Sequence, residues 1–478
     1  MTIANETPPP LPAPDSDGLI VVVGMGRSGI GAARLLQAQG RRVCVIESRH
    51  TASLEASATA LRQQGIAVVL GMPLDPASLH HLGEPLAMVI VSPGIRWDHP
   101  LFEQLRQQGI PVHGELVPAW RSCRSVPWIG ITGTNGKTTV THLVSHLLQT
   151  AGVDAPMAGN VGHSVAERVL ERQQGSHDLP DWLVVELSSY QIEAAAELAP
   201  RIGIWTTLTP DHLERHGTVD NYRAIKRSLL DRCGLRILNA DDPDLHSHAA
   251  NWDQATWVSA EGRSRLPAET EGALWIEAGR VLEHRHGAAT DLMAADALAM
   301  PGAHNRQNML LAAAAARAAG LSGEQLEQGL RSFPGVPHRL EHIRELDGVR
   351  FVNDSKATNY DAAEVALRAL EPPLVVLAGG EAKQGEPAAW LRELARQARG
   401  VVLYGAAQQA FEQLLQGAQF PGTVACCPGL AEAVPRAAAL ARTLQCRTVL
   451  LSPACASFDQ YSDFEARGEH FRQLVQQL

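Results

Sequence analysis

The stretch GITGTNGKTTVTHLV, residues Gly130–Val144, places glycines, a lysine and threonines between an apolar run and a helical pattern. Gly133 and Gly136 permit the tight turn of a phosphate-binding loop, and Lys137 supplies a cation for phosphate oxygens. The usual loop of this type has a glycine five residues before Gly136, where this chain has Ile131. The stretch therefore predicts a strand, a nucleotide-binding loop of variant type and a helix, with an ordinary turn before a helix as the alternative.

Short apolar runs alternate with helical patterns along the whole chain, which is typical of α/β proteins with parallel sheets. We expect three domains: an N-terminal Rossmann-like domain, a central P-loop-type ATPase domain with a mostly parallel sheet, and a C-terminal Rossmann-like α/β domain. Residues 252–298 look like short strands whose order the sequence does not give. Expected strands fall within residues 18–23, 41–49, 87–95, 126–131, 181–189, 201–212, 234–242, 349–355, 374–380, 400–405 and 448–454.

The domain boundaries follow from composition. The proline-rich residues 1–17 are expected to be a disordered tail, followed by domains at 18–114, 115–335 and 336–478. Prolines at 334 and 337 indicate a hinge between the last two domains. A third domain that closes on the second there would exclude water from a reaction.

The overall composition excludes several classes of protein. The chain has 478 residues, of which 45% are hydrophobic, and a net charge of -10, so no basic field attracts nucleic acid or anionic lipid. Seven scattered cysteines without CxxC pairs favour a cytoplasmic protein without a zinc site. No apolar run reaches the length of a membrane span and no signal peptide is recognisable, so we expect no membrane insertion.

A second glycine-rich loop follows the first expected strand. Gly24, Gly26 and Gly29 form a G-x-G-x-x-G motif between strand and helix, which suits a nucleotide diphosphate. Glu47 ends the next strand, where an acid could bind a ribose. The motif does not distinguish NAD from a UDP-sugar, and a glycine turn needed only for packing is the alternative.

Three further positions could serve a metal ion beside the phosphate loop. Thr138 offers a hydroxyl to Mg²⁺ and a cap to the following helix, and Glu186 ends a buried strand, where an unpaired carboxylate would be costly. His212 follows the next strand, and beside Glu186 and Lys137 we expect it to serve a metal or phosphate. Lys226, taken by itself, has the sequence surroundings of a surface lysine.

Taken together, the motifs resemble those of the Mur ligases, the ATP-dependent amide-forming enzymes of peptidoglycan synthesis. The resemblance covers the chain apart from its N-terminal tail and includes the loop pattern G-T-N-G-K-[ST], which identifies the opening stretch as a true phosphate loop. The segments that carry it are GTNGKT at 133–138, AGNVG at 158–162, SPGI at 92–95, HRLE at 338–341, NDSKATN at 353–359 and LSPACASFDQYSDFEARG at 451–468.

This resemblance implies a reaction and its participants. It implies that ATP activates the carboxylate of UDP-N-acetylmuramoyl-L-alanine as an acyl phosphate, which the amine of D-glutamate then attacks. Two Mg²⁺ ions and a carbamylated lysine would assist, and His212 or a phosphate oxygen would take the proton of the amine. The sequence itself does not fix the stereochemistry of the glutamate. We expect a monomer with no nucleic-acid partner.

The resemblance also assigns residues to each ligand. UDP-substrate binding falls to Gly24, Gly26, Arg27, Ser28, Glu47, Ser48, Arg49, Gly94 and Asn160. ATP binding falls to Gly133, Thr134, Asn135, Gly136, Lys137, Thr138, Thr139, Asn305, Asn308, Arg339 and Asp354. Metal binding falls to Thr138, Glu186, His212 and carbamylated Lys226; glutamate binding to Thr358, Lys383, Ser457 and Phe464; and catalysis to Lys137, His212, Lys226 and Lys356.

The loop Glu381–Gly385 departs from the expected pattern, because the glycine after Lys383 is displaced by one residue. Three other readings stay open at this stage. The chain could be another Mur-type or folylpolyglutamate-type ligase, an NAD-binding oxidoreductase that uses Gly24–Gly29, or a nucleotide-binding scaffold without catalysis.

Overall fold

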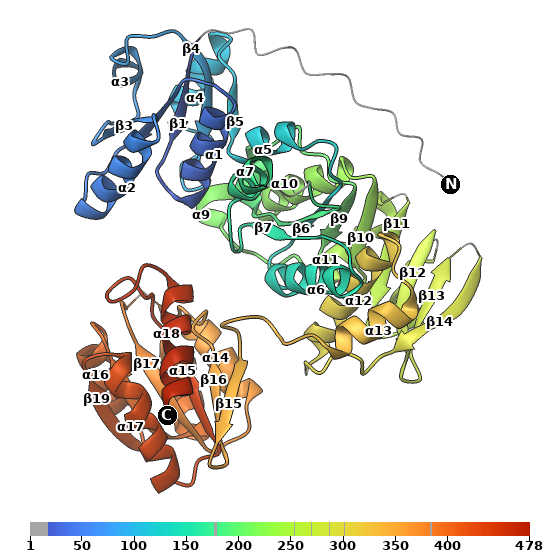
Figure 1. Ribbon diagram of the computed structural model, residues 1–478. Helices are drawn as coiled ribbons and strands as arrows, with labels where there is room; N and C mark the ends of the chain where they lie inside the picture. Colours follow the sequence, from blue (N-terminus) through green and yellow to red (C-terminus); the bar gives the residue numbers. More distant parts are fainter. Residues whose placement is uncertain are drawn as a thin grey trace. The chain divides into compact units, whose positions relative to one another are not determined.

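The computed structural model describes residues 18–175, 179–252, 254–268, 270–285, 287–300, 302–382 and 385–478. The chain divides into two compact units, Met1–Phe333 and Pro334–Leu478, and these contain three sheets (Figure 1). The α/β fold class with three mostly parallel sheets is confirmed. No helix among the described ranges is long and apolar enough to cross a membrane. All seven cysteines are free thiols.

The first sheet has five parallel strands in the order β3-β2-β1-β4-β5. Buried aliphatic side chains on its two faces form two separate clusters, as expected for a parallel sheet covered on both sides. The strands are β1 (Leu19–Val23), β2 (Val43–Glu47), β3 (Ala67–Leu70), β4 (Leu86–Val91) and β5 (Val112–Gly114), and the helices are α1 (Arg27–Ala38), α2 (Ala52–Gln63), α3 (Pro76–His80) and α4 (Pro100–Gln107).

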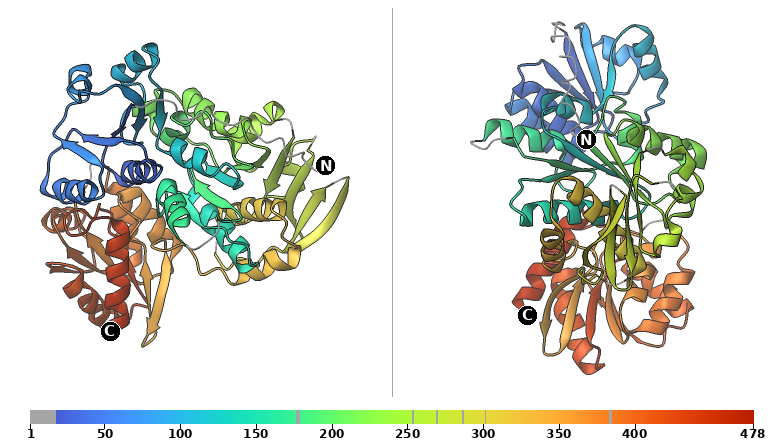
Figure 2. Two further views of the ribbon diagram at one scale, coloured as in Figure 1. Left: turned by 45° about the horizontal axis from the view of Figure 1, so that its top comes forward. Right: turned by 90° about the vertical axis from the view of Figure 1, so that its right-hand side faces the viewer.

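The second sheet has nine strands in the order β14-β13-β12-β11-β10-β9-β6-β8-β7. It is parallel from β7 to β12 and ends in antiparallel strands, which extend at one end of the sheet in both Figure 1 and Figure 2. Residues 252–298 thus contain the short strands that the sequence predicted without order. The strands are β6 (Trp128–Thr132), β7 (Met157–Gly159), β8 (Leu183–Glu186), β9 (Ile202–Trp205), β10 (Leu235–Asn239), β11 (Ala255–Ser259), β12 (Gly272–Glu277), β13 (Arg280–Arg285) and β14 (Ala288–Ala294).

Helices cover both faces of this sheet. One core packs α6 (Lys137–Thr150), α12 (Ala303–Ala318) and α13 (Gly323–Arg331) on the face of Ile129 and Ile131. The other core lies on the face of Trp128. Its helices are α5 (Leu116–Ser122), α7 (Val165–Gln174), α8 (Ser189–Glu193), α10 (Val219–Asp231) and α11 (Pro243–Ser247), with the short α9 (Leu213–His216) preceding α10.

Helix α1 of the first sheet packs directly on α7 of the second. A Cβ atom at Gly31 would lie 2.2 Å from Ser164 Oγ, so the glycine allows this close approach. Arg34 on α1 pairs with Glu167 on α7 at 2.9 Å. The glycine loop that precedes α1 is therefore tied to the central sheet within one compact unit.

The second unit holds a sheet in the order β15-β16-β20-β17-β18-β19, in which only β15 is antiparallel to its neighbour. Two cores lie on its faces. The strands are β15 (Glu341–Leu346), β16 (Val349–Asn353), β17 (Leu374–Gly379), β18 (Ala398–Tyr404), β19 (Thr423–Cys427) and β20 (Thr448–Leu451), and the helices are α14 (Tyr360–Ala369), α15 (Ala388–Gln397), α16 (Gln408–Gly417), α17 (Leu430–Thr443) and α18 (Phe464–Gln477).

Candidate active site

The phosphate loop joins β6 to α6 and depends on two glycines. Gly136 is the residue that caps α6, with φ 86°, and Gly133 has φ 146°. A Cβ atom at Gly133 would collide with Thr206, and one at Gly136 would lie 2.6 Å from Asn308 Oδ1. The expectation that Thr138 caps the helix is wrong, because Gly136 takes the cap position and leaves Thr138 in the first turn.

The segment that follows β9 fixes the shape of this loop. Thr134 N donates to Thr207 O at 2.8 Å, and Asn135 N donates to Thr207 Oγ1 at 3.0 Å. The hydroxyl of Thr134 donates to Thr209 O at 3.1 Å. These bonds hold the turn in a defined shape and leave the N–H groups at the start of α6, rather than those of Thr134 and Asn135, for an anion.

Lys137 lies over the loop that precedes it. Its Nζ donates to Gly133 O at 2.9 Å and to Thr134 O at 2.8 Å. Both of these acceptors are neutral carbonyl oxygens, and the two bonds hold the ammonium group over the loop. The lysine is thus placed where the sequence predicts a cation for phosphate oxygens.

Lys226 is almost fully buried on α10, with 1% of the residue exposed. Its Nζ donates to Gly133 O at 3.0 Å and lies 4.4 Å from the centroid of the Tyr222 ring. Burial, and secondly repulsion by Lys137, lower the pKa of Lys226 well below its usual value. The expectation of a surface lysine, based on its neighbours in sequence, is therefore wrong, because this side of α10 packs against the phosphate loop.

Glu186 ends β8, beside the strand that leads into the loop. Ile131 pairs with Glu186 in the parallel register of β6 and β8. Only 2% of Glu186 is exposed, and its Oε1 accepts from Asn160 Nδ2 at 2.9 Å. The other oxygen, Oε2, is buried and has no hydrogen-bond partner among the described residues. A cation would remove the cost of this bare carboxylate oxygen, so Glu186 fits a Mg²⁺ ligand.

His212 begins α9 in a left-handed conformation, with φ 54°. Its ring nitrogens lie 3.5 Å from Asp211 and 3.7 Å from Glu214, and its ring packs 5.1 Å from that of Tyr190. Within the part of the chain that the structure describes, no three histidine, cysteine, aspartate or glutamate residues converge as a ready metal site.

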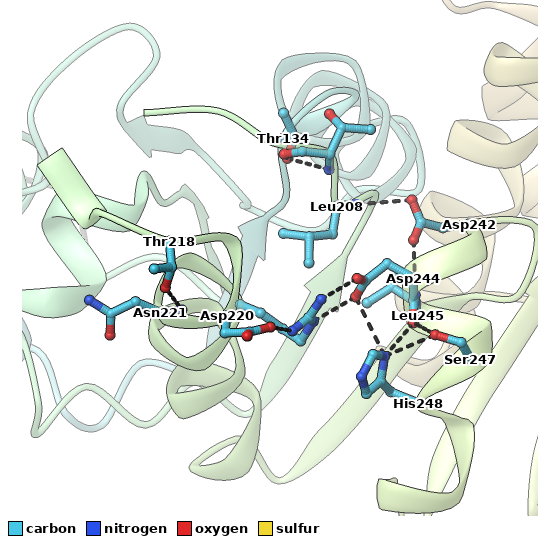
Figure 3. A network of polar contacts seen from close by, with 12 residues as sticks. Thr134, Leu208, Thr218, Asp220, Asn221, Asp242, Asp244, Leu245, Ser247 and His248 are labelled. Carbon is cyan, nitrogen blue, oxygen red and sulfur yellow. Dashed lines mark hydrogen bonds and ion pairs between the residues drawn. The ribbon is translucent and has the colours of Figure 1, made fainter. Parts of the chain in front are cut away.

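A network of polar contacts lies near the phosphate loop (Figure 3). Asp242 accepts from Leu208 N and, as the cap of α11, from Leu245 N, both at 2.9 Å. Arg223, one turn before Lys226, donates to Asp244 of α11 at 2.8 Å. Asp242 and Arg223 thereby connect α11 to the segment after β9 and to α10. Burial raises the pKa of Asp242 above its usual value.

We expect Asp242→Asn to weaken both the fold and ATP binding. One carboxylate oxygen becomes an NH₂ group, which faces a backbone N–H and leaves a buried donor unsatisfied at a cost of about 1–3 kcal/mol. Denaturant unfolding and the KM for ATP measure the two effects. Asp75→Asn is the matched control, because Asp75 is likewise a helix cap that accepts from a backbone N–H, that of Ser78, but on the distant α3. Equal changes in both variants would contradict this role of Asp242.

The predicted adenine-binding asparagines lie on α12, which packs against α6. Asn305 and Asn308 are both buried, with 6% and 7% exposed. The position of Asn308 Oδ1 near Gly136 places this part of α12 beside the phosphate loop. The other loop residue in the prediction, Thr139, is buried in the first turn of α6.

The N-terminal glycine loop is closely packed against β4. Gly24 has φ 96°, and a Cβ atom at Gly29 would lie 2.2 Å from Gly24 O and 2.5 Å from Ser92 Oγ. Packing therefore requires two of the three glycines. A Cβ at Gly26 would meet no atom within 4 Å, so this glycine leaves open space. That space is consistent with close approach by a diphosphate.

Glu47 stabilises the same loop from the end of β2. Its Oε2 accepts from Met25 N at 3.1 Å, and its Oε1 accepts from Arg49 N and Nε. Burial would raise the pKa of Glu47, but the hydrogen bonds from Arg49 and Met25 outweigh it and lower the pKa below its usual value. Of the other predicted UDP-binding positions, Ser28 is half-buried and the exposed ones are Arg27, Ser48, Arg49, Gly94 and Asn160.

The predicted ATP residues of the second unit lie around the end of β16. Asp354 is buried and accepts from Leu340 N at 3.2 Å and from Ser452 Oγ at 3.1 Å. Burial raises the pKa of Asp354 to about 7. Arg339, next to Leu340 in sequence, is exposed.

The predicted amino-acid residues lie in the same unit. Lys356 Nζ lies 4.0 Å from the centroid of the Phe464 ring, and Thr358 N donates to Lys356 O at 2.8 Å. Ser457 is buried, with 2% exposed. Lys383 lies outside the described residues, so its predicted role stays a prediction. The structure thus brings Lys356, Thr358 and Phe464 together.

Arg467 is a residue that the sequence reasoning missed. It is fully buried and donates to Ser355 Oγ, Ser355 O, Cys455 O and Ala456 O at 2.9–3.1 Å. These neutral acceptors lie in the two loops that also carry Lys356 and Ser457. The arginine belongs to the quoted segment 451–468, but its burial had no sequence signal.

Lysine usage is a signal that could have identified Lys226. The chain has only four lysines among its 41 lysines and arginines. They are Lys137, Lys226, Lys356 and Lys383, and all four occupy predicted site positions. Arginine supplies the other cations of this chain. A lysine therefore indicates a position that needs a compact ammonium group, or an amine whose pKa can be lowered, which arginine does not provide.

Comparison with known proteins supports the resemblance over the whole chain. Three family profiles match: "Mur ligase MurD-like, N-terminal domain" at residues 18–114, "Mur ligase middle domain" at 131–316 and "Mur ligase, glutamate ligase domain" at 338–455. A protein named UDP-N-acetylmuramoylalanine--D-glutamate ligase from Prochlorococcus marinus (strain MIT 9313) is 56% identical, over 95% of this chain and 98% of the relative. A protein of the same name from Rippkaea orientalis is 46% identical, over 96% and 98%.

Solved structures agree at the level of the fold. The crystal structure of UDP-N-acetylmuramate-alanine ligase from Thermotoga maritima has a TM-score of 0.56 at 18% identity, covering 96% of this chain and 99% of that one. A pseudomurein peptide ligase type C from Methanothermus fervidus has a TM-score of 0.52 at 17% identity, with coverage of 96% and 100%. From its sequence identity and its three matched domains, the chain belongs to the Mur ligase family.

Proposed function

We propose that the protein is an ATP-dependent ligase that joins D-glutamate to UDP-N-acetylmuramoyl-L-alanine in the synthesis of peptidoglycan precursors. The observation that carries this proposal is the 56% identity, over nearly the full length, to a protein named for that reaction. The phosphate loop beneath Lys137 and the bare carboxylate oxygen of Glu186 support the same chemistry.

The chemistry of amide formation explains why the site needs its cations. A carboxylate is a poor electrophile, so the γ-phosphoryl group of ATP is transferred to it, giving an acyl phosphate and ADP. Lys137 stabilises the negative charge that gathers on the phosphoryl oxygens, and the backbone N–H groups of the loop hold the nucleotide. Glu186 and Thr138 would hold a magnesium ion, which would supply further positive charge to the same oxygens.

The burial of Lys226 suits a chemical modification rather than an ion pair. A lysine whose pKa is lowered is neutral over a wider pH range, and a neutral amine can add to CO₂. The new N–C bond forms as one proton is released, leaving an anionic carbamate. We propose that this carbamate supplies the oxygen ligand for a second magnesium ion, which an unmodified ammonium group could not do.

The second half of the reaction is attack by the amine of glutamate on the acyl phosphate. The amine must be deprotonated. His212 is the candidate side chain, because it is partly exposed and follows the segment that contacts the phosphate loop. A phosphate oxygen is the alternative base. Phosphate then leaves from the tetrahedral intermediate. We propose that Lys356, Thr358, Ser457 and Phe464 of the second unit bind the amino acid, together with Lys383.

The direct test is ADP formation by the purified protein with ATP, Mg²⁺ and UDP-N-acetylmuramoyl-L-alanine. D-glutamate is expected to give turnover, and L-glutamate and a panel of other amino acids are expected to give little. Turnover with a different amino acid would favour another amide ligase. NADH binding without any ATP turnover would favour a dinucleotide enzyme and contradict the proposal.

We predict that Arg49→Ala raises the KM for the UDP substrate and leaves the KM for ATP unchanged. Arg49 is exposed at the end of β2, where its guanidinium can reach a ligand, and losing one charged hydrogen bond costs about tenfold in affinity. Steady-state kinetics with each substrate varied measures both constants. Arg62→Ala is the control, because Arg62 pairs with Glu55 on α2 and should change neither constant. If Arg49→Ala raised the KM values for the UDP substrate and for ATP equally, the UDP site would not lie at Arg49.

A further inference from the structure

Arg215 connects the turn that contains Gly94, a predicted UDP-binding residue, to the short helix that follows His212. Its Nη1 donates to Ile95 O at 3.2 Å, and its Nη2 pairs with Glu193 at 3.3 Å. Only 11% of the side chain is exposed. The sequence analysis predicts no role for Arg215, and the proposed reaction does not use it.

One of the two segments is the turn that contains Gly94. Ile95 N donates to Ser92 O at 3.0 Å, which closes the turn after β4. The Ser92 side chain in turn contacts the glycine loop through Gly24 O at 3.1 Å. By binding the carbonyl of Ile95, Arg215 therefore fixes a turn that is joined to the N-terminal glycine loop.

The other segment is α9, for which His212 is the N-cap residue. Arg215 is the last but one residue of this four-residue helix, and its guanidinium lies 4.7 Å from the centroid of the Tyr190 ring. The same ring packs against His212. His212 has a left-handed backbone, which is uncommon for a residue with a side chain and persists only when its surroundings enforce it.

We propose that Arg215 is a positioning residue for the muramoyl nucleotide, holding the Gly94 turn and the helix of His212 in one fixed geometry. This inference rests on the proposed function. Two acids, Glu193 and Asp98, interact with the positive charge of Arg215.

The test measures binding of UDP-N-acetylmuramoyl-L-alanine without ATP to Arg215→Met and Arg215→Lys. Losing the bond to Ile95 O should raise the Kd about tenfold in Arg215→Met, while the KM for ATP stays within about twofold. Arg215→Lys keeps a cation beside Glu193 but lacks the two-pronged guanidinium, so it should fold and still raise the Kd about fivefold. If Arg215 only stabilised the fold, its loss would not raise the Kd for the muramoyl nucleotide while leaving the KM for ATP unchanged.

Arg34→Met is the matched control, because Arg34 also joins the first sheet to the central one through an ion pair with Glu167. Its Kd for the muramoyl nucleotide should stay within about twofold of the wild type. An unchanged Kd in both Arg215 variants, or an equal rise in the Arg34 variant, overturns the inference. Wild-type protein that binds no muramoyl nucleotide overturns the proposed function and this inference together. If the wild type binds it and the Kd of both Arg215 variants is unchanged, this inference alone is overturned.

Discussion

Lys137→Met is expected to abolish ADP formation while leaving the protein folded. The substitution removes the cation over the phosphate loop but keeps an unbranched side chain of similar length. Losing a preorganised charge at a transferring phosphoryl group costs at least about 10²–10³-fold in kcat. Of the carbonyl oxygens that accept from Lys137, Gly133 O keeps its bond from Lys226, and Thr134 O belongs to a half-buried residue that water can reach.

The measurement is ADP release under saturating substrates, with circular dichroism and thermal unfolding as the check on folding. Lys137→Arg is an informative second variant, because it keeps a positive charge but lengthens and widens the group. We expect it to be nearly as inactive, since the loop carbonyls accept from one compact ammonium. Wild-type turnover by Lys137→Met would show that this loop does not carry the phosphoryl transfer.

Substitution of Lys226 is expected to have the second largest effect, and its two variants should behave differently. Lys226→Ala removes the proposed metal-binding carbamate and should lower activity about 100-fold. It also leaves a space next to Gly133 O, which acetate or formate can enter, so added short-chain carboxylates should restore part of the activity. Lys226→Arg should be inactive with or without carboxylate, because a guanidinium stays protonated and fills the space.

Activity against carboxylate concentration distinguishes these outcomes, and ¹³C NMR after exchange with labelled bicarbonate detects the carbamate directly. The chain's four lysines make such a spectrum simple to assign. Full activity of Lys226→Ala would contradict the carbamate. Full activity of Lys226→Arg would show that a permanent cation suffices at this buried position.

The sequence predicted the central strands of each sheet and missed the edges. Strands such as β1, β6 and β17 are buried on both faces, so they are continuous apolar runs. The missed strands β3, β5, β7, β15 and β19 all lie at the edge of a sheet. Strand β15 has mixed burial, and β5 and β7 are only three residues long, so none of these three forms a long apolar run. Strand β3, with the sequence AVVL, was missed although it is apolar.

Side chains at the site were predicted where a backbone motif places them. Gly133, Gly136 and Lys137 follow from the strand, loop and helix pattern, and Glu186 from an acid at the end of an apolar strand. Lys226 and Arg467 could not be derived in this way, because their burial depends on which elements pack against them. Helix α10 turns Lys226 toward the phosphate loop, and two distant loops enclose Arg467.

The most direct test of the account follows one oxygen atom through the reaction. If ATP phosphorylates the carboxylate of UDP-N-acetylmuramoyl-L-alanine, one carboxylate oxygen leaves with the phosphate when the amide forms. With ¹⁸O in that carboxylate and D-glutamate as the acceptor, ³¹P NMR is expected to show one ¹⁸O atom in each phosphate released. Unlabelled phosphate accompanying amide formation would contradict the account.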